Sequence, residues 1–183
     1  MDNGVSSYRR YLEGDEEAFH EIVKEYFDNL VFFIDRYVSD YAAAEDIALD
    51  AFTQLVVHKH RYNFSVSLKT YLFMIGRSRA LDYIRHRDKL RMVELSEAAR
   101  MASQEPSPEE LVLADERKRA VNQAMSQLGE ELRLVLHLVY FEGMTPDEVS
   151  KVLKKNRKQV YNLLYRGKTA LRTILGEEGE LLL

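Results

Sequence analysis

The chain has 183 residues, a formal net charge of −4 and no cysteine, which excludes disulfides, Cys-based zinc sites and thiol nucleophiles. It holds only 3 prolines and 8 glycines, shows no long run of alternating apolar and polar residues, and has no apolar run long enough to span a membrane. The composition therefore predicts an all-α protein without membrane insertion. Because the first residues lack the apolar core of a signal peptide, we expect it to be cytoplasmic.

Charge is distributed unevenly along the chain. Residues 1–50 carry 13 acids and 4 bases, whereas residues 77–91 carry six bases and two acids. Residues 94–116 are acidic again, with seven acids and one base, and residues 146–172 carry eight bases and two acids. Two basic surfaces, one in each half, predict contacts with nucleic acid. The acidic first helices are expected to contact something other than DNA.

The N-terminal half is predicted to contain a short arm at residues 8–13 and three long helices. Apolar residues recur at helical spacing over about residues 16–38, 41–60 and 68–91. The outer face of the second helix carries Glu45, Asp46, Asp50 and Gln54. A solvated face with favourable charge near a helix N-terminus is one explanation of these acids.

Two aromatic residues, Tyr62 and Phe64, lie in a predicted loop at residues 61–67. The helix that follows begins apolar and becomes basic along its length. Such an arrangement suits single-stranded nucleic acid, because aromatic rings stack on unpaired bases and cations follow the phosphates. Packing into the core is the other explanation. It is favoured for Tyr71, whereas Tyr62, Phe64 and Tyr83 are compatible with either role.

A small and acidic segment at residues 92–107 is predicted to be a linker between two domains. A cap signal with Pro at the first helical position starts a helix at about residue 108, which is expected to end near residue 127. A further helix is predicted at about residues 130–141. The tail from Gly176 onward is expected to be frayed.

Two short helices joined by a tight polar turn are predicted between Thr145 and Arg172. Thr145 and Glu148 form a capping box, and Asn156 with Gln159 repeats that signal before the second helix. The pattern is that of a helix-turn-helix, whose second helix enters the major groove of DNA. An ordinary solvated helix pair is the alternative. The inner stripe of the second helix is Val160, Leu164 and Leu171, and its outer face carries Arg157, Lys158, Tyr161, Asn162 and Arg166.

No catalytic constellation is found in the sequence. The five histidines are scattered, and His58 and His60 cannot share one face of a helix. A glycine-rich phosphate loop is also absent. We therefore expect a protein that is not an enzyme, with no metal, no cofactor and no small-molecule substrate.

Three runs in the first half carry a family resemblance: YLEGDEEAF (11–19), AEDIALDAF (44–52) and SLKTYLFMIGRSRALDYIRHR (67–87). In the second half it is carried by the spacing of Leu128, Arg133 and the run from Tyr140 to Met144, followed by the helix-turn-helix. With these features the sequence resembles the extracytoplasmic-function (ECF) sigma factors, the smallest initiation factors of the bacterial sigma-70 type. The resemblance implies a region 2 helical bundle at residues 8–91 and a region 4 helix-turn-helix domain at residues 108–176, joined by the acidic linker.

Members of that family bind core RNA polymerase and direct it to promoters. The resemblance implies core RNA polymerase, promoter DNA and an anti-sigma factor as partners. It places contacts to the −35 duplex at Arg157, Lys158, Gln159, Tyr161, Asn162, Arg166 and Lys168. It places contacts to the melted −10 strand at Tyr62, Asn63, Phe64, Arg77, Ser78, Arg79, Asp82 and Arg85. It places contacts to the polymerase at Glu45, Asp46, Asp50 and Gln54.

The sequence departs from the family pattern at several positions. Leu49-Asp50 replaces the usual Gln-Glu, and Ser78 replaces the Asn often found in the −10 helix. Leu163 stands where a cation is common in the recognition helix, so we expect there either a packing contact or an apolar contact to a thymine methyl. The alternative function is a helix-turn-helix regulator that binds duplex DNA without melting it.

Overall fold

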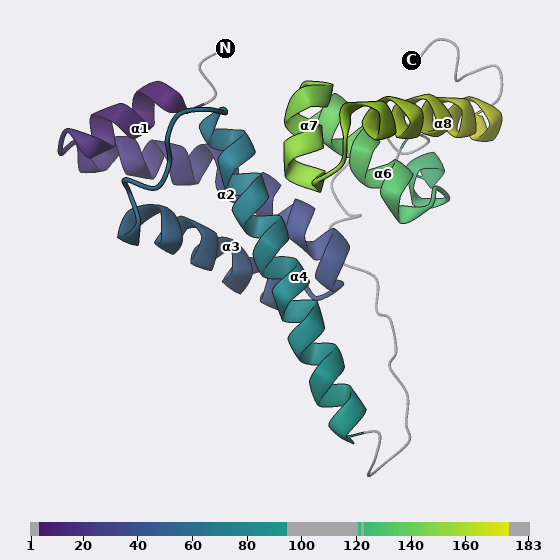
Figure 1. Ribbon diagram of the computed structural model, residues 1–183, viewed down its shortest axis with the longest axis horizontal. Coiled ribbons are helices and arrows are strands. Elements are labelled where there is room, and N and C mark those ends of the chain that lie inside the picture. The colour runs from purple at the N-terminus through teal and green to yellow at the C-terminus, as the bar shows by residue number, and fades with distance from the viewer. Residues whose placement is uncertain (1–3, 95–120, 122, 176–183) are drawn as a thin grey trace. The chain divides into compact units, whose positions relative to one another are not determined.

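A computed structural model of the protein describes residues 4–94, 121 and 123–175, and every ordered element in this part of the protein is a helix (Figure 1). The protein divides into two compact units, residues 1–107 and 108–183. These two helical units confirm the predicted all-α fold. The linker predicted at residues 92–107 and the helix predicted from residue 108 lie largely outside the described residues.

Four helices form the described part of the N-terminal unit. They are α1 (Val5–Leu12), α2 (Glu16–Val38), α3 (Tyr41–Val57) and α4 (Leu68–Glu94). Helices α2, α3 and α4 pack pairwise against one another, and α1 packs on α2 (Figure 1). Their shared core is filled by side chains that recur at helical spacing along α2, including Ile22, Tyr26, Leu30 and Ile34. Burial of an aliphatic side chain of this size contributes roughly 1.5–3 kcal/mol.

Local caps determine where α2 and α3 begin. The Asp15 carboxylate accepts a hydrogen bond from the Ala18 amide at 3.3 Å, and the Asp40 carboxylate accepts one from the Ala43 amide at 3.1 Å. Each cap satisfies one of the amides that have no partner within the first helical turn. Helix α2 ends where Ser39 adopts a left-handed conformation with φ of 51°. The predicted bounds of α2 are confirmed.

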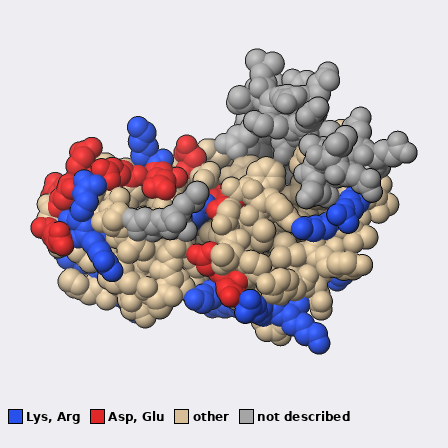
Figure 2. Space-filling view, turned by 90° about the horizontal axis from the view of Figure 1, so that it is seen from above, with Lys and Arg blue, Asp and Glu red and all other residues tan. Residues whose placement is uncertain are grey.

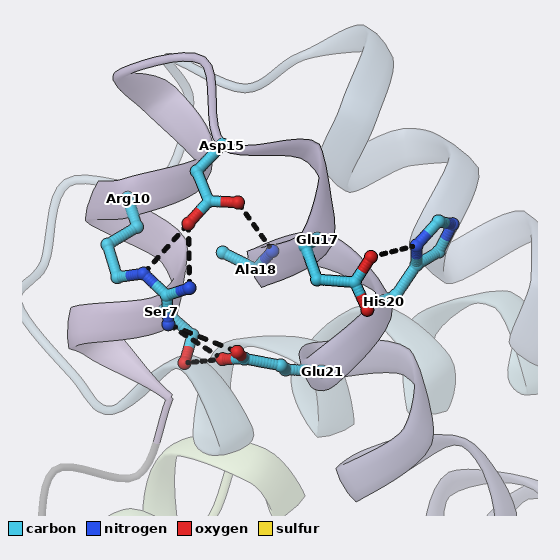
Figure 3. Close-up of polar contacts among 7 residues, drawn as sticks. All are labelled: Ser7, Arg10, Asp15, Glu17, Ala18, His20 and Glu21. Carbon is cyan, nitrogen blue, oxygen red and sulfur yellow. Dashed lines mark hydrogen bonds and ion pairs between the residues drawn. The ribbon is translucent and has the colours of Figure 1, made fainter.

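Helix α1 is held to the start of α2 by a polar network (Figure 3). The Arg10 guanidinium donates to the Asp15 carboxylate at 2.6 and 2.9 Å and to the Glu21 carboxylate at 2.9 Å. The Ser7 hydroxyl also donates to Glu21, at 3.2 Å. Because these charged groups are largely exposed, each pair contributes at most ~1 kcal/mol. Figure 2 shows further Asp and Glu side chains gathered at this end of the N-terminal unit.

Helices α2 and α4 approach closely at Gly76. A Cβ atom at this position would lie 2.8 Å from Cδ1 of Leu30 and 3.1 Å from Cδ1 of Ile34. Both of these side chains are fully buried and have little room to move. Glycine therefore lets the two helices pack at the point where α4 changes from apolar to basic.

The described part of the C-terminal unit also consists of helices. After a helical turn at residues 123–126 come α6 (Glu130–Leu136), the π-helical turn η2 (His137–Phe141), α7 (Pro146–Leu153) and α8 (Arg157–Leu175). Helix α6 packs on α8, and α7 packs on both η2 and α8. Leu136 of α6 sits against Gly167 of α8, where a Cβ atom would lie 2.9 Å from Cδ1 of the leucine.

The helix predicted at residues 130–141 is not a continuous α-helix. Its last turn widens, so that the Glu142 amide donates to the His137 carbonyl at 3.1 Å and the Met144 amide donates to the Leu138 carbonyl at 2.9 Å. The His137 and Glu142 side chains are both buried and lie 3.2 Å apart, Nε2 to Oε1. A widened turn brings these two groups together across five residues, which apolar periodicity alone does not predict.

Arg133 joins α6 to the helical turn before it. Its guanidinium donates to the carbonyl oxygens of Met125, Ser126 and Leu128 at 3.0, 2.7 and 2.8 Å. These carbonyls lie at the end of a helical turn, where backbone donors are scarce, although the Met125 carbonyl also accepts the Leu128 amide at 3.1 Å. The Arg133 guanidinium thus caps the C-terminal end of the segment that leads into α6.

Candidate nucleic-acid interfaces

The helix-turn-helix of α7 and α8 is fixed by two reciprocal capping boxes. The Glu148 amide donates to the Thr145 hydroxyl at 3.3 Å, and the Thr145 amide donates to the Glu148 carboxylate at 2.9 Å. The Gln159 amide donates to the Asn156 side-chain oxygen at 2.8 Å, and the Asn156 amide donates to the Gln159 side-chain oxygen at 2.9 Å. Between them, Lys154 ends α7 with φ of 51°. The sequence prediction for this motif is confirmed.

The outward face of α8 carries most of the predicted −35 contacts. Six of the seven side chains are exposed: Arg157, Lys158, Gln159, Tyr161, Asn162 and Arg166. Lys168 is half-buried, and its ammonium lies 5.3 Å from the centre of the Tyr140 ring, beside η2. Six polar side chains on one exposed face, three of them cationic, can follow phosphates and reach base edges in a major groove.

Arg157 is positioned by two neighbours at the start of α8. Its Nε atom lies 3.1 Å from the Asp147 carboxylate of α7, and its guanidinium carbon lies 5.8 Å from the centre of the Tyr161 ring. A hydrogen bond with Tyr161 and the charge of Asp147 raise the pKa of Arg157. The Arg157 guanidinium is therefore a permanent, exposed cation at the first residue of α8.

Gln159 has a capping role that competes with its predicted contact to a base. Its side-chain oxygen accepts the Asn156 amide, which uses one of the two lone pairs of that oxygen and holds the side chain at the start of α8. Bidentate recognition of adenine by glutamine requires both the oxygen and the nitrogen of the amide. Asn162 lies on the same exposed face and keeps both groups available in this structure.

The structure decides between the two roles considered for Leu163. Its side chain is only 7% exposed, and it belongs with Val160 and Leu164 to the buried residues of α8. Leu163 therefore makes the packing contact and is not available to a thymine methyl.

The loop between α3 and α4 rests on an aromatic cluster. Tyr62 is only 3% exposed, and its ring lies 5.0 Å from that of Tyr71 and 5.5 Å from that of Tyr8. Its hydroxyl donates to the Val66 carbonyl across the loop. Tyr62 thus takes the core alternative, since its buried ring is not available to a base in this structure. Tyr83 is half-buried on α4.

Phe64 is presented at the surface by a turn in the same loop. Its ring is 37% exposed and lies 4.7 Å from that of Tyr62. The Asn63 side-chain oxygen accepts the Ser65 amide at 3.1 Å, which forms an Asx turn around Phe64. Phe64 itself has φ of 59°, a left-handed conformation that costs a bulky residue about 1–3 kcal/mol.

In the basic half of α4, some of the arginines already interact with groups of the protein itself, so only part of the positive charge is available to a nucleic acid. Arg85 pairs with Asp82 at 2.7 Å, and Arg87 donates to the Val38 carbonyl at the end of α2. Arg79 is exposed and donates to Gln54 of α3 at 3.1 Å. The predicted contacts Ser78 and Asp82 are exposed, and Arg77 is half-buried.

Helix α3 presents a mixed face to solvent. Asp46 and Asp50 are exposed, while Glu45 and Gln54 are half-buried. Between the two aspartates, Leu49 is 53% exposed, so an apolar side chain lies at the centre of the acidic face. The contact between Gln54 and Arg79 joins this face to the basic face of α4.

Sequence reasoning missed two exposed residues on these surfaces. Tyr165 lies on the outward side of α8, one turn beyond Tyr161 and Asn162. Its helical spacing from those residues was a sufficient signal. Arg9 of α1 lies over the ring of Phe64, with 5.3 Å between its guanidinium carbon and the ring centre. No local pattern reveals this contact between residues 55 positions apart.

These surfaces define the class of protein. Two helical units, one with a doubly capped helix-turn-helix and a basic outward face, are the architecture of a DNA-binding transcription factor. Among the described helices, none has the length and apolar character that a membrane span requires.

Comparison with known proteins identifies the family. Residues 22–90 match Sigma-70 region 2, and residues 118–171 match Sigma-70, region 4. The ECF RNA polymerase sigma factor SigW of Bacillus subtilis is 28% identical over 172 residues, covering 90% of this chain and 92% of SigW. The RNA polymerase sigma-H factor of Pseudomonas aeruginosa is 26% identical over 170 residues, covering 88% of each chain. The protein belongs to the ECF subfamily of the sigma-70 family.

Solved structures show the same fold. The sigma factor RpoE of Bartonella quintana, in complex with the anti-sigma factor NepR, aligns with a TM-score of 0.64 and 19% identity, covering 87% of this chain and 97% of RpoE. CnrH, in complex with the cytosolic domain of CnrY, aligns with a TM-score of 0.62 and 20% identity, covering 95% of this chain and 97% of CnrH.

Proposed function

We propose that this sigma factor binds core RNA polymerase in the cytoplasm and directs promoter-specific initiation by reading the −35 duplex and opening the −10 element. The outward face of α8 is the observation that carries the proposal. Its cations and amide side chains are exposed on a helix whose start is fixed by a capping box, as base readout requires.

The N-terminal unit supplies the −10 half of the proposal. Phe64 is exposed in the α3–α4 loop, and exposed aromatic rings stack on unpaired bases with roughly 1–3 kcal/mol each. Arg79, Ser78 and Asp82 are exposed on α4, the helix that follows this loop. Within the predicted set Tyr62 has a supporting role, because its buried ring holds the loop under Phe64.

Helix α3 is the proposed polymerase-docking surface. Charge reversal by Asp46→Lys together with Asp50→Lys is expected to weaken binding of core polymerase at least tenfold, since both carboxylates are exposed and have no cation beside them among the described residues. Asp28→Lys is the matched control, because Asp28 is an exposed acid on α2. Equal binding by the double variant and the control would remove α3 from the interface.

Run-off transcription on a promoter library with purified core polymerase tests the function as a whole. Promoter-specific transcripts that require the protein support sigma activity. Specific binding of the free protein to duplex DNA without initiation would instead support the helix-turn-helix regulator. Binding to polymerase without any initiation would indicate a decoy that occupies the enzyme.

An anti-sigma factor is a further proposed partner. RpoE and CnrH, which share the fold of this protein, were each solved with an anti-sigma factor or the cytosolic domain of a partner protein. Because the present sequence has no cysteine, any thiol-based sensing would have to reside in that partner. Co-purification from the native host, followed by mass spectrometry of the bound partner, tests this proposal.

A further inference from the structure

Two consecutive arginines on α1 have different surroundings. Arg10 is held by the carboxylates of Asp15 and Glu21 (Figure 3). Arg9 forms no ion pair with any residue that the structure describes, and its exposed guanidinium lies over Phe64. The charge of Arg10 is thus neutralised within the protein, whereas that of Arg9 is available to a ligand.

The helix that carries Arg9 is firmly attached to the loop that carries Phe64. The Tyr8 hydroxyl donates to the carbonyl oxygens of Lys59 at 2.8 Å and Leu55 at 3.2 Å, just where α3 ends. The Tyr8 ring is fully buried and meets the Tyr62 ring edge-on. Burial raises the pKa of the Tyr8 phenol, so it remains a protonated donor. Arg9 therefore has a fixed position beside the loop.

The loop is also shaped for presenting one ring. The Asx turn of Asn63 and the left-handed conformation of Phe64 place a strained aromatic residue at the surface, close to Tyr62 and to Arg9. Strained residues persist where the surrounding structure fixes them, and they cluster at binding sites. Exposed Lys59 and Arg61, near the start of the connection between α3 and α4, add further positive charge.

We propose that α1 is part of the single-strand binding surface, with Arg9 contacting the phosphate next to the base that stacks on Phe64. An aromatic ring for the base and an unneutralised cation for the backbone are the two components of sequence-tolerant single-strand binding. The inference rests on the proposed −10 function. It adds α1 to the single-strand binding surface, because none of the residues predicted to contact the melted strand lies in α1.

The test measures binding of a fluorescein-labelled single-stranded 12-mer of degenerate sequence to the holoenzyme, at several salt concentrations. The binding constant falls with rising salt, and loss of one cation–phosphate contact makes the slope of log K against log salt less steep by about 0.7 for single strands. Arg9→Gln is therefore expected to reduce that slope by about 0.7 and to weaken binding roughly tenfold at low salt. Arg9→Lys keeps the charge and is expected to retain the slope.

Arg10→Gln is the matched control, because it removes the same charge from the adjacent position. It should lower the melting temperature slightly and leave the salt slope unchanged, since Arg10 is neutralised by Asp15 and Glu21. Phe64→Ala separates the two levels of the proposal. If it weakens binding while Arg9→Gln leaves the slope intact, the role of Arg9 is refuted and the −10 function stands. If the wild-type holoenzyme binds the strand no better than core polymerase alone, both are refuted.

Discussion

The competition at Gln159 leads to a quantitative prediction about base readout. Because its side-chain oxygen is held at the Asn156 amide, turning the side chain outward to reach adenine with both amide groups would leave that backbone amide without its partner. Asn162 has no such conflict on the same face. We expect Asn162→Ala to weaken binding of the promoter duplex by ~1–3 kcal/mol, the usual value of a good bidentate pair. Gln159→Ala should weaken it by less than ~1 kcal/mol.

The same substitution should affect the helix itself. Loss of a capping interaction costs about 1 kcal/mol, which corresponds to roughly fivefold faster amide hydrogen exchange in the first turn of α8. Gln159→Glu should retain the slow exchange, because a carboxylate also accepts the Asn156 amide and suits a helix N-terminus. It should nevertheless weaken duplex binding, since it places a negative charge near the phosphates.

The assay combines holoenzyme binding to a duplex selected from the promoter library with hydrogen exchange on the free protein. Exchange is preferred to global unfolding because the protein has two units, whose melting need not be a single transition. The reasoning would be refuted if Gln159→Ala reduced DNA binding as much as Asn162→Ala while exchange in the first turn of α8 stayed slow. That result would mean that Gln159 reads a base and contributes nothing as a cap.

Three further predictions concern stability. Gly76→Ala should destabilise the N-terminal unit by ~1–2 kcal/mol, seen as faster hydrogen exchange in α2 and α4, because the clash with Leu30 outweighs the helix propensity of alanine. Arg133→Ala should destabilise the C-terminal unit by about 2 kcal/mol, since it removes the guanidinium shared by three carbonyl oxygens and leaves those of Ser126 and Leu128 without this donor, and hydrogen exchange around residues 125–128 should accelerate. Arg10 lowers the pKa of Asp15, so the stability from this carboxylate is complete above its ordinary pKa of 3.8 and is lost as the pH falls through the lower folded-state value. Asp15→Asn should reduce that acid dependence in a pH series of thermal melts.

The sequence predicted features whose causes are local. The bounds of α2 follow from Asp15 at its start and from the loss of apolar spacing after Val38. The helix-turn-helix was predicted down to its two capping boxes, because a cap is formed by residues three positions apart. The outward face of α8 could be predicted for the same reason, since helical periodicity alone separates inner from outer positions.

Other features required partners that lie far away in the sequence. The end of α3 was predicted at His60, but the helix stops at Val57, where Tyr8 of α1 binds the carbonyls of Leu55 and Lys59. The arm predicted at residues 8–13 belongs to α1, Val5–Leu12. The widened turn after α6 likewise accompanies the close approach of two buried side chains, His137 and Glu142. The periodicity of apolar residues does not predict that these two side chains meet.

The candidate sites divide along the same line. Composition and motif spacing determined that this protein has a helix-turn-helix with a basic outward face and an aromatic loop, because both depend on residue type and short spacing. Tertiary structure decided which aromatic ring is available. Tyr62 and Phe64 are two positions apart and both aromatic, yet the more polar Tyr62 is buried against α1 whereas Phe64 is exposed beside Arg9. Burial depends on which element packs against a segment, and that choice is made by the whole fold rather than by the segment itself.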